Sequence, residues 1–270
     1  MALAAAQPAA ATVGRPEAGA LAPVRPSYAV LADLADSAPL VLRLEVRKLV
    51  RVEPERAPGV QPGMGRFYAE ARVKALITGN AALGEAQRYL IDLPIDAKGK
   101  PPPLSKKQVL LFARQVPDQP GVLQPVTRDA QLLWDPDTET TLRVILTELL
   151  APGAPGRISG VREAIFVPGA LAGEGETQIF LATQDGSAAS ISVRRKPGEA
   201  PKWGVSFSEL TDNGVPPMRD TLAWYRLACF LPQALPPATN LSETPEDRAQ
   251  AQIDYRFVMA SLGACSRTRG

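Results

Sequence analysis

Two stretches of alternating apolar and polar residues near the N-terminus constrain the fold of this chain most. Over residues 40–52 and 66–75, apolar side chains recur at every second position, and charged side chains fill most positions between them. The apolar set is Leu40, Leu42, Leu44, Val46, Val50 and Val52 in the first stretch and Phe67, Ala69, Ala71, Val73 and Ala75 in the second. Successive side chains of a strand point to opposite faces, so the pattern predicts two long strands that each bury one face.

Three shorter apolar runs, at residues 87–93, 108–114 and 122–126, predict further strands. Three consecutive prolines at residues 101–103 mark a turn between two of them, because a central strand does not tolerate that sequence. No helical segment between these strands is long enough for a crossover connection. We therefore expect an antiparallel sheet that closes, or nearly closes, into a small OB-like β-barrel.

Capping residues and apolar spacing predict a short helix at residues 27–35, behind Ser27, and a longer one at residues 136–150, behind Asp135. Pro136 occupies the first position of the second helix, where a missing N–H costs nothing, and acidic residues fill its first turn. The Pro- and Gly-containing segment at residues 151–156 is the expected boundary between two halves of the chain.

The second half is expected to contain a four-stranded meander and two helices. The strands are predicted at residues 160–167, 177–183, 188–195 and 202–210. Gly186 supports a hairpin between the middle pair, because glycine accepts the positive φ that such a turn needs. The helices are predicted at residues 221–230, capped by Asp220, and from Thr244 to Gly263, which ends the second one.

The predicted fold class is α+β, with an N-terminal antiparallel OB-like β-barrel followed by a four-stranded antiparallel meander and two C-terminal helices. The predicted domains are residues 27–150, the barrel with its closing helix, and residues 157–270, the α+β meander domain. Residues 1–26 are rich in Ala and Pro and are expected to be disordered. They carry small residues that a signal peptidase accepts but lack a basic start and a strong apolar core, so a signal remnant and a plain low-complexity tail both stay open.

The chain contains no histidine, and this absence excludes more chemistry than any motif adds. Ser-His-Asp hydrolases, Cys-His proteases and His-ligated zinc or haem sites all need an imidazole. Glycine-rich phosphate loops of the GxGxxG and GxxxxGK[ST] types are also missing, which argues against nucleotide-dependent chemistry. We expect no cofactor and no metal. No apolar run approaches the roughly 18 residues of a membrane-spanning helix, so no membrane span is expected.

Glu174 and Glu176 flank Gly175 just before a predicted strand and are the candidate catalytic residues. A pair of acids can act as general acid and base or bind a hard cation. The alternative is a solvated, glycine-hinged turn that leads into the strand. No third partner is identifiable from the sequence, and the spacing does not match an EF-hand loop.

Basic side chains on the first two strands, with one aromatic among them, are typical of an OB-type barrel that binds single-stranded nucleic acid. They are Arg43, Arg47, Arg51, Arg66, Tyr68, Arg72 and Lys74. Glu45 and Glu70 interrupt this row, and cross-strand ion pairs on an exposed face explain the same residues without a ligand. The net charge of only +2 adds no overall field that attracts nucleic acid.

Trp203, Trp224 and Arg226 are the candidate partner-binding residues, because aromatic side chains beside a guanidinium make good anchors at protein interfaces. On the predicted helix, Leu222 and Tyr225 form the apolar face, and Trp224 and Arg226 lie off it. A position in the core is the alternative, and the exposure of Trp224 decides between the two.

Cys229 and Cys265, the only cysteines, lie in or just after the two C-terminal helices. If these helices pack together or on the meander, the two cysteines come within disulfide reach. A disulfide suits an oxidising compartment, so we expect a periplasmic or otherwise extracytoplasmic protein. Two buried, reduced thiols are the alternative.

Residues 35–42 (ADSAPLVL), a polar loop, residues 67–79 (FYAEARVKALITG) and residues 109–112 (VLLF) together resemble the OB-type barrel of netrin and metalloproteinase-inhibitor modules. The resemblance covers about residues 33–126 and rests on strand patterns, and the disulfides of the animal members are missing from this region. It implies an extracytoplasmic module that binds other proteins and does not catalyse. No individual residue carries over.

These observations favour a non-catalytic, extracytoplasmic binding or structural protein that holds a protein partner through sheet edges and exposed aromatic side chains. A carboxylate-dependent hydrolase or lyase that uses Glu174 and Glu176 is the first alternative. Binding of single-stranded nucleic acid is the second.

Overall fold

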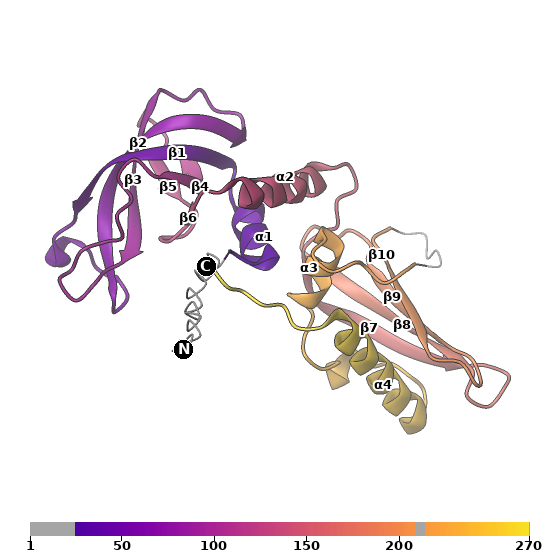
Figure 1. Cartoon of the computed structure of the whole chain (residues 1–270). Coiled ribbons are helices and arrows are strands. Elements are labelled where there is room, and N and C mark those ends of the chain that lie inside the picture. Colours follow the sequence, from indigo (N-terminus) through magenta and orange to yellow (C-terminus); the bar gives the residue numbers. More distant parts are fainter. Residues whose placement is uncertain (1–24, 209–213, 270) are drawn as a thin grey trace, which may run out of the picture.

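The structure is a computed structural model that describes residues 25–208 and 214–269. It contains two antiparallel sheets that lie at opposite ends of the molecule, with helices between them (Figure 1). The predicted α+β class is therefore confirmed. The prediction of disorder over residues 1–26 lies almost entirely outside the described residues.

The first sheet contains six strands in the order β3-β2-β1-β4-β5, with β6 paired to β4. The strands are β1 (Leu40–Arg51), β2 (Met64–Thr78), β3 (Ala86–Pro94), β4 (Gln108–Gln115), β5 (Leu123–Pro125) and β6 (Gln131–Leu133), with a 3-10 turn η1 (Pro54–Arg56) after β1. All five strand pairs in this sheet are antiparallel.

The first sheet is not closed into a barrel, which corrects the prediction of an OB-like β-barrel. Its edge strand β3 and the segment around β5 are joined by one parallel bridge, between Arg88 and Val122, and by hydrogen bonds from the Arg88 N–H to the Gly121 carbonyl (2.8 Å) and from the Asp92 N–H to the Arg128 carbonyl (2.7 Å). A longer ladder is not available, because β5 has only three residues and its last one, Pro125, has no N–H to donate.

The alternation in β1 places Leu42, Leu44 and Val46 in a core inside the first sheet, as predicted. The prediction fails at Val50, which is 44% exposed. A register shift between Val46 and Lys48 inserts an extra residue opposite β2, and this bulge reverses the face to which every later side chain of β1 points.

Two helices cover the opposite face of the first sheet, where the start of β1, at Val41, lies beside Leu110 and Phe112 of β4. Helix α1 (Tyr28–Ser37) starts behind Ser27, whose hydroxyl accepts a hydrogen bond from the Val30 N–H, and α2 (Pro136–Leu150) starts behind Asp135. Both predicted caps are confirmed. Val41 of β1 points to the face opposite that of Leu40 and Leu42, and the two helices bury it fully.

The second sheet has the order β10-β9-β8-β7, which confirms the predicted meander. Its strands are β7 (Ile158–Pro168), β8 (Gly175–Thr183), β9 (Ser190–Arg195) and β10 (Lys202–Ser206). Gly186, with φ +75°, lies in the loop between β8 and β9 as expected. The end of the predicted fourth strand, after residue 208, lies outside the described residues.

Helices α3 (Leu222–Ala228) and α4 (Pro245–Leu262) pack on the second sheet, with a 3-10 turn η2 (Pro237–Thr239) between them (Figure 1). A reciprocal capping box of Thr244 and Asp247 starts α4, and Gly263 ends it, as predicted. The cap of α3 is Thr221 and not Asp220. Asp220 has φ +59°, whereas a capping residue needs extended backbone.

The larger of the two cores is continuous across both halves of the chain. It joins α1, α2 and residues of β4 to the buried face of the second sheet and to α3 and α4. The domain boundary at residues 151–156 stays a prediction, because buried side chains on both sides of it belong to this one cluster. None of the helices in the described part of the chain has the length and apolarity of a membrane span.

Candidate functional site

A hollow of about 540 Å³ at the end of the second sheet brings together the two carboxylates that the sequence analysis singled out. Glu174 lies in the loop before β8, and Glu176 is the second residue of that strand. Other lining side chains come from the ends of β7 and β9 and include Val167, Ala170, Arg194, Arg195 and Lys196. The sequence analysis missed this basic wall, because residues 194–196 are far from Glu174 along the chain.

The carboxylate of Glu176 is paired within the protein. The register of β8 and β9 places Glu176 opposite Arg194, and the Arg194 Nε lies 3.5 Å from the Glu176 Oε1. The Gln178 amide, two residues further along the same face of β8, donates to the same oxygen. The Glu176 carboxylate is therefore engaged by a guanidinium and an amide of the same chain.

The carboxylate of Glu174 organises the loop between β7 and β8. The Leu171 N–H donates to the Glu174 Oε2 at 3.3 Å, and the Glu174 N–H donates back to the Leu171 carbonyl at 3.0 Å. The side chain of Glu174 also packs directly over Gly169, where no Cβ fits. These contacts place Glu174 in the glycine-hinged turn that was the alternative, and within that turn its carboxylate is bound by a backbone N–H.

Asp254 of α4 is fully buried beneath this hollow, and the sequence analysis did not identify it. Its carboxylate accepts hydrogen bonds from the Thr177 hydroxyl, from the Arg195 guanidinium (Nε, 2.6 Å) and from the Gln250 amide (3.1 Å). Three donors satisfy this buried charge, so Asp254 fixes α4 to β8 and β9 and orients Arg195 along one wall of the hollow.

The charges that line the hollow nearly cancel. Arg195 is neutralised by Asp254 and Arg194 by Glu176, which leaves Glu174 and Lys196 as opposite charges. Among the described residues, no group of three or more acidic or sulfur-bearing side chains has the arrangement of a metal site. The hollow can therefore receive a neutral, partly apolar group better than a highly charged one.

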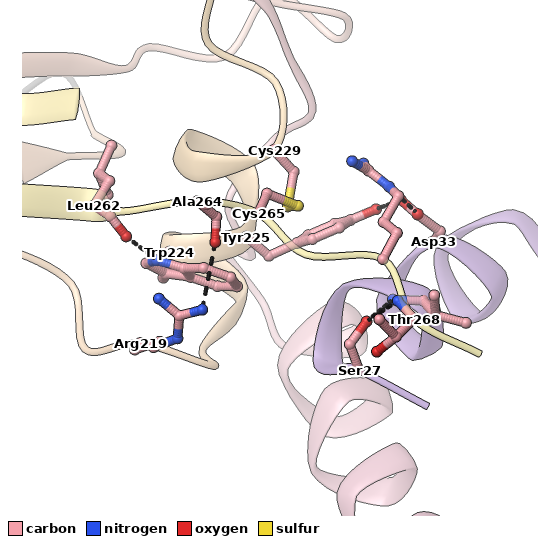
Figure 2. Close-up of a disulfide and its surroundings, with 12 residues drawn as sticks. Ser27, Asp33, Arg219, Trp224, Tyr225, Cys229, Leu262, Ala264, Cys265 and Thr268 are labelled. Carbon is pink, nitrogen blue, oxygen red and sulfur yellow. Dashed lines mark hydrogen bonds and ion pairs between the residues drawn. A yellow bond between two sulfur atoms is a disulfide. The ribbon is translucent and has the colours of Figure 1, made fainter. Parts of the chain in front are cut away.

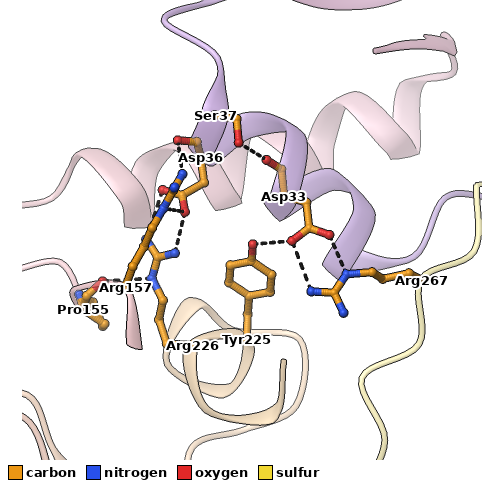
Figure 3. Close-up of polar contacts among 8 residues, drawn as sticks. All are labelled: Asp33, Asp36, Ser37, Pro155, Arg157, Tyr225, Arg226 and Arg267. Carbon is orange, nitrogen blue, oxygen red and sulfur yellow. Dashed lines mark hydrogen bonds and ion pairs between the residues drawn. The ribbon is translucent and has the colours of Figure 1, made fainter. Parts of the chain in front are cut away.

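The two halves of the protein meet at a buried ion pair between α1 and α3 (Figure 3). The two carboxylate oxygens of Asp36 accept hydrogen bonds from the Arg226 Nη1 (2.5 Å) and Nη2 (3.1 Å), and Arg157 binds the same carboxylate through its Nε (2.5 Å). The Arg226 Nε donates to the Pro155 carbonyl at 3.0 Å. Burial raises the pKa of Asp36, but the hydrogen bonds from the two guanidinium groups outweigh it and hold the pKa below its ordinary value.

One helical turn earlier on the same face of α1, Asp33 contacts both α3 and the C-terminal tail (Figure 3). It accepts a hydrogen bond from the Tyr225 hydroxyl (2.6 Å) and one from the Arg267 Nε (2.7 Å). Burial and the adjacent carboxylate raise the pKa of the Tyr225 hydroxyl, so it remains a donor. The spacing of Asp33 and Asp36, three residues apart on a helix, is the sequence signal that locates this joint.

The three candidate partner-binding side chains are buried in the structure. Trp224 is 3% exposed, Arg226 4% and Trp203 7%. The Trp224 Nε1 donates to the Leu262 carbonyl (2.9 Å), and the Trp203 Nε1 donates to the Ser261 hydroxyl (3.0 Å). All three positions therefore follow the core alternative. Trp203 of β10 belongs to the core of the second half, and α3 packs between α1, α2 and α4 and has no free face on which Trp224 and Arg226 could lie.

Cys229 and Cys265 form a disulfide, which confirms that prediction (Figure 2). Their Cα atoms are 5.1 Å apart, and the bond joins the end of α3 to the tail that follows α4. This tail then continues toward α1 of the other half.

The basic side chains predicted to form a nucleic-acid-binding face on β1 and β2 are engaged in ion pairs and hydrogen bonds within the protein. The pairs are Arg43 with Glu139, Arg47 and Lys74 with Glu45, Arg66 with Asp92, and Arg72 with Glu85. Arg51 donates to the Gly99 carbonyl. This arrangement agrees with the alternative of ion pairing on a sheet face, and it leaves little uncompensated positive charge for a nucleic-acid backbone.

No family model matches this chain, and no curated protein matches it either.

Proposed function

We propose that this protein is a non-catalytic, extracytoplasmic binding protein that holds a protein partner, and that the hollow at the end of the second sheet receives part of that partner. One observation carries the proposal. The hollow that contains Glu174 and Glu176 is nearly neutral, and it is lined by an exposed apolar side chain, Val167, at 59% exposure.

An apolar contact surrounded by polar and charged groups is the usual composition of a protein interface. Val167 can contact an apolar side chain of the partner, and Lys196 and Glu174 can form polar contacts around it. Catalysis receives less support, because both carboxylates are engaged by groups of the same chain, Glu176 by Arg194 and Glu174 by the Leu171 N–H.

An extracytoplasmic location is supported by the Cys229–Cys265 disulfide, since such bonds persist in oxidising compartments. We further propose that the N-terminal half is related to the OB-type barrel of netrin and metalloproteinase-inhibitor modules. The strand order β3-β2-β1-β4-β5 and the parallel bridge between Arg88 and Val122 support this relation, because a partly open five-stranded barrel brings its edge strands together in this way.

Photo-crosslinking in the native host tests the binding surface. The crosslinking amino acid p-benzoylphenylalanine replaces Val167 in one variant and Val144 in a matched control, because Val144 is similarly exposed (52%) but lies on α2. We expect a discrete protein adduct from position 167 and none from position 144. In a second pair of variants, the protein identified in the adduct is recovered by affinity purification without crosslinking. It should be recovered with the wild-type protein and with Val144→Asp, but not with Val167→Asp.

The proposal is wrong if neither position yields an adduct, or if both yield the same set of adducts. A measurable turnover by the purified protein that Glu176→Gln abolishes, with an unchanged circular dichroism spectrum, would favour the hydrolase or lyase alternative.

A further inference from the structure

The last residues of the chain return from the second half of the protein to the first. The Ser27 N–H donates to the Thr268 carbonyl at 2.8 Å, and the Thr268 N–H donates to the Ser27 hydroxyl at 3.2 Å (Figure 2). Arg267 pairs with Asp33 of α1, and the Arg269 Nη1 lies 3.1 Å from an Asp129 carboxylate oxygen in the loop before β6. Residues 263–269, which we call the C-terminal strap, therefore contact the N-terminal half at three places.

The C-terminal strap is anchored to the second half where it begins. The Cys229–Cys265 disulfide ties it to the end of α3, and the Arg219 guanidinium donates to the Ala264 carbonyl at 3.3 Å (Figure 2). One residue before the strap, the Leu262 carbonyl accepts the Trp224 indole N–H. The covalent anchor thus lies only three residues before Thr268.

The contacts that the strap makes with the first half are exposed and polar. Arg267, Thr268 and Arg269 are all exposed, and exposed ion pairs of this kind contribute little by themselves because water competes for them. The disulfide changes this balance. With Cys265 fixed, Thr268 stays within about 10 Å of Cys265, so its rebinding to Ser27 is an intramolecular event at high effective concentration.

We propose that the C-terminal strap is a redox-sensitive lock between the two halves of the protein: the Cys229–Cys265 disulfide keeps the strap on α1, and reduction releases it. The inference does not depend on what the protein binds. It implies that the strap stays on the first half in an oxidising compartment and leaves it in a reducing one, while the shared core and the Asp36–Arg226 pair keep the halves together.

The chemistry of release is thiol–disulfide exchange. A dithiol such as dithiothreitol attacks one sulfur as a thiolate and forms a mixed disulfide, and its second thiol then displaces the protein sulfur. The protein disulfide gains two electrons and two protons, and the dithiol becomes a cyclic disulfide. Cys229 and Cys265 are both only partly buried, so the reagent has access to them.

Hydrogen exchange followed by mass spectrometry tests the lock in the full chain. The oxidised protein, the protein reduced with dithiothreitol, and the double variant Cys229→Ser with Cys265→Ser are compared. Without the disulfide the strap is held at Leu262, six residues before Thr268 instead of three, so we expect the amides near Ser27 to exchange about threefold faster in the two forms that lack it. Peptides of β8, which the strap does not contact, serve as the internal control and should keep their protection.

Trypsin gives a second measurement on the strap itself. Cleavage after Arg267 should be about threefold faster without the disulfide. In the oxidised protein, Thr268→Pro removes the N–H that binds Ser27 and should also expose the amides near Ser27, although the disulfide is intact. The proposal is overturned if reduction leaves exchange near Ser27 unchanged. It is equally overturned if β8 loses protection together with Ser27, because the disulfide then supports the fold of the whole half.

Discussion

Replacing Asp36 with Asn tests the ion pair that joins the two halves. Arg226, whose side chain is 4% exposed, has no other carboxylate partner among the described residues and would retain two neutral acceptors, the Pro155 carbonyl and the amide oxygen of the new side chain. Breaking a buried ion pair from one side costs about 3–5 kcal/mol, because the remaining charge is left without compensation. Arg157 is 36% exposed and can turn to water. We therefore expect a loss at the lower end, about 3 kcal/mol, in the free energy of unfolding.

The measurement is urea unfolding followed by tryptophan fluorescence, since Trp134 reports on the first half and Trp203 and Trp224 report on the second. A loss of this size corresponds to a decrease of roughly 6–12 °C in the melting temperature. Glu199→Gln is the matched control, because Glu199 forms an exposed ion pair with Lys202, and it should change the midpoint far less.

A double variant distinguishes charge from packing at the same joint. Asp36→Leu combined with Arg226→Met removes both charges and keeps much of the buried volume, so it should be less destabilising than Asp36→Asn alone. The reasoning is refuted if Asp36→Asn shifts the urea midpoint no more than Glu199→Gln does.

Three further predictions concern pH, packing and helix capping. Burial raises the pKa of Asp36, but two guanidinium groups hold it below its ordinary value, so the folded state binds fewer protons than the unfolded state at low pH. The free energy of unfolding should therefore decrease as the pH falls below about 4. Asp36→Asn should flatten this dependence when urea midpoints are measured across an acid titration. Gly204→Ala in β10 should lower the free energy of unfolding by about 1–3 kcal/mol in a thermal unfolding assay, because the added Cβ would lie 1.8 Å from the Gly214 carbonyl oxygen. Gly160→Ala in β7 is the control and should be tolerated, because its Cβ would meet nothing within 4 Å. Thr244→Ala removes the capping box of α4 and should lower stability by about 1 kcal/mol in the same assay, and an unchanged melting temperature would show that the cap does not limit stability.

Local chemistry was sufficient to predict most of the secondary structure. The N-terminal caps of three helices are the predicted residues Ser27, Asp135 and Thr244. They could be predicted because the capping side-chain oxygen binds free N–H groups of the first turn, only two or three residues along the chain. The strand β6 was not predicted, since three residues are too few to show a period. The bulge near Lys48 was also invisible, because it becomes defined only when β1 pairs with β2.

The burial of α3 was not predictable from its own periodicity. A one-sided apolar pattern assigns Leu222 and Tyr225 to the core and leaves Trp224 and Arg226 outside, but that rule assumes a single packing partner. Here α3 contacts both α1 and α4, so its opposite sides are buried as well. Arg226 can occupy that position because Asp36 supplies a carboxylate from another helix.

The sequence by itself determined which segments become strands and helices, that no imidazole chemistry is available, and that Cys229 and Cys265 are suitable for pairing. These properties depend on residue type and on spacing within a few positions. Only the tertiary structure decided that the first sheet stays open, that Glu174 and Glu176 share a hollow with a basic wall, and that the tail returns to Ser27. Each of these depends on contacts between residues far apart in the chain, whose geometry is set by the packing of whole elements.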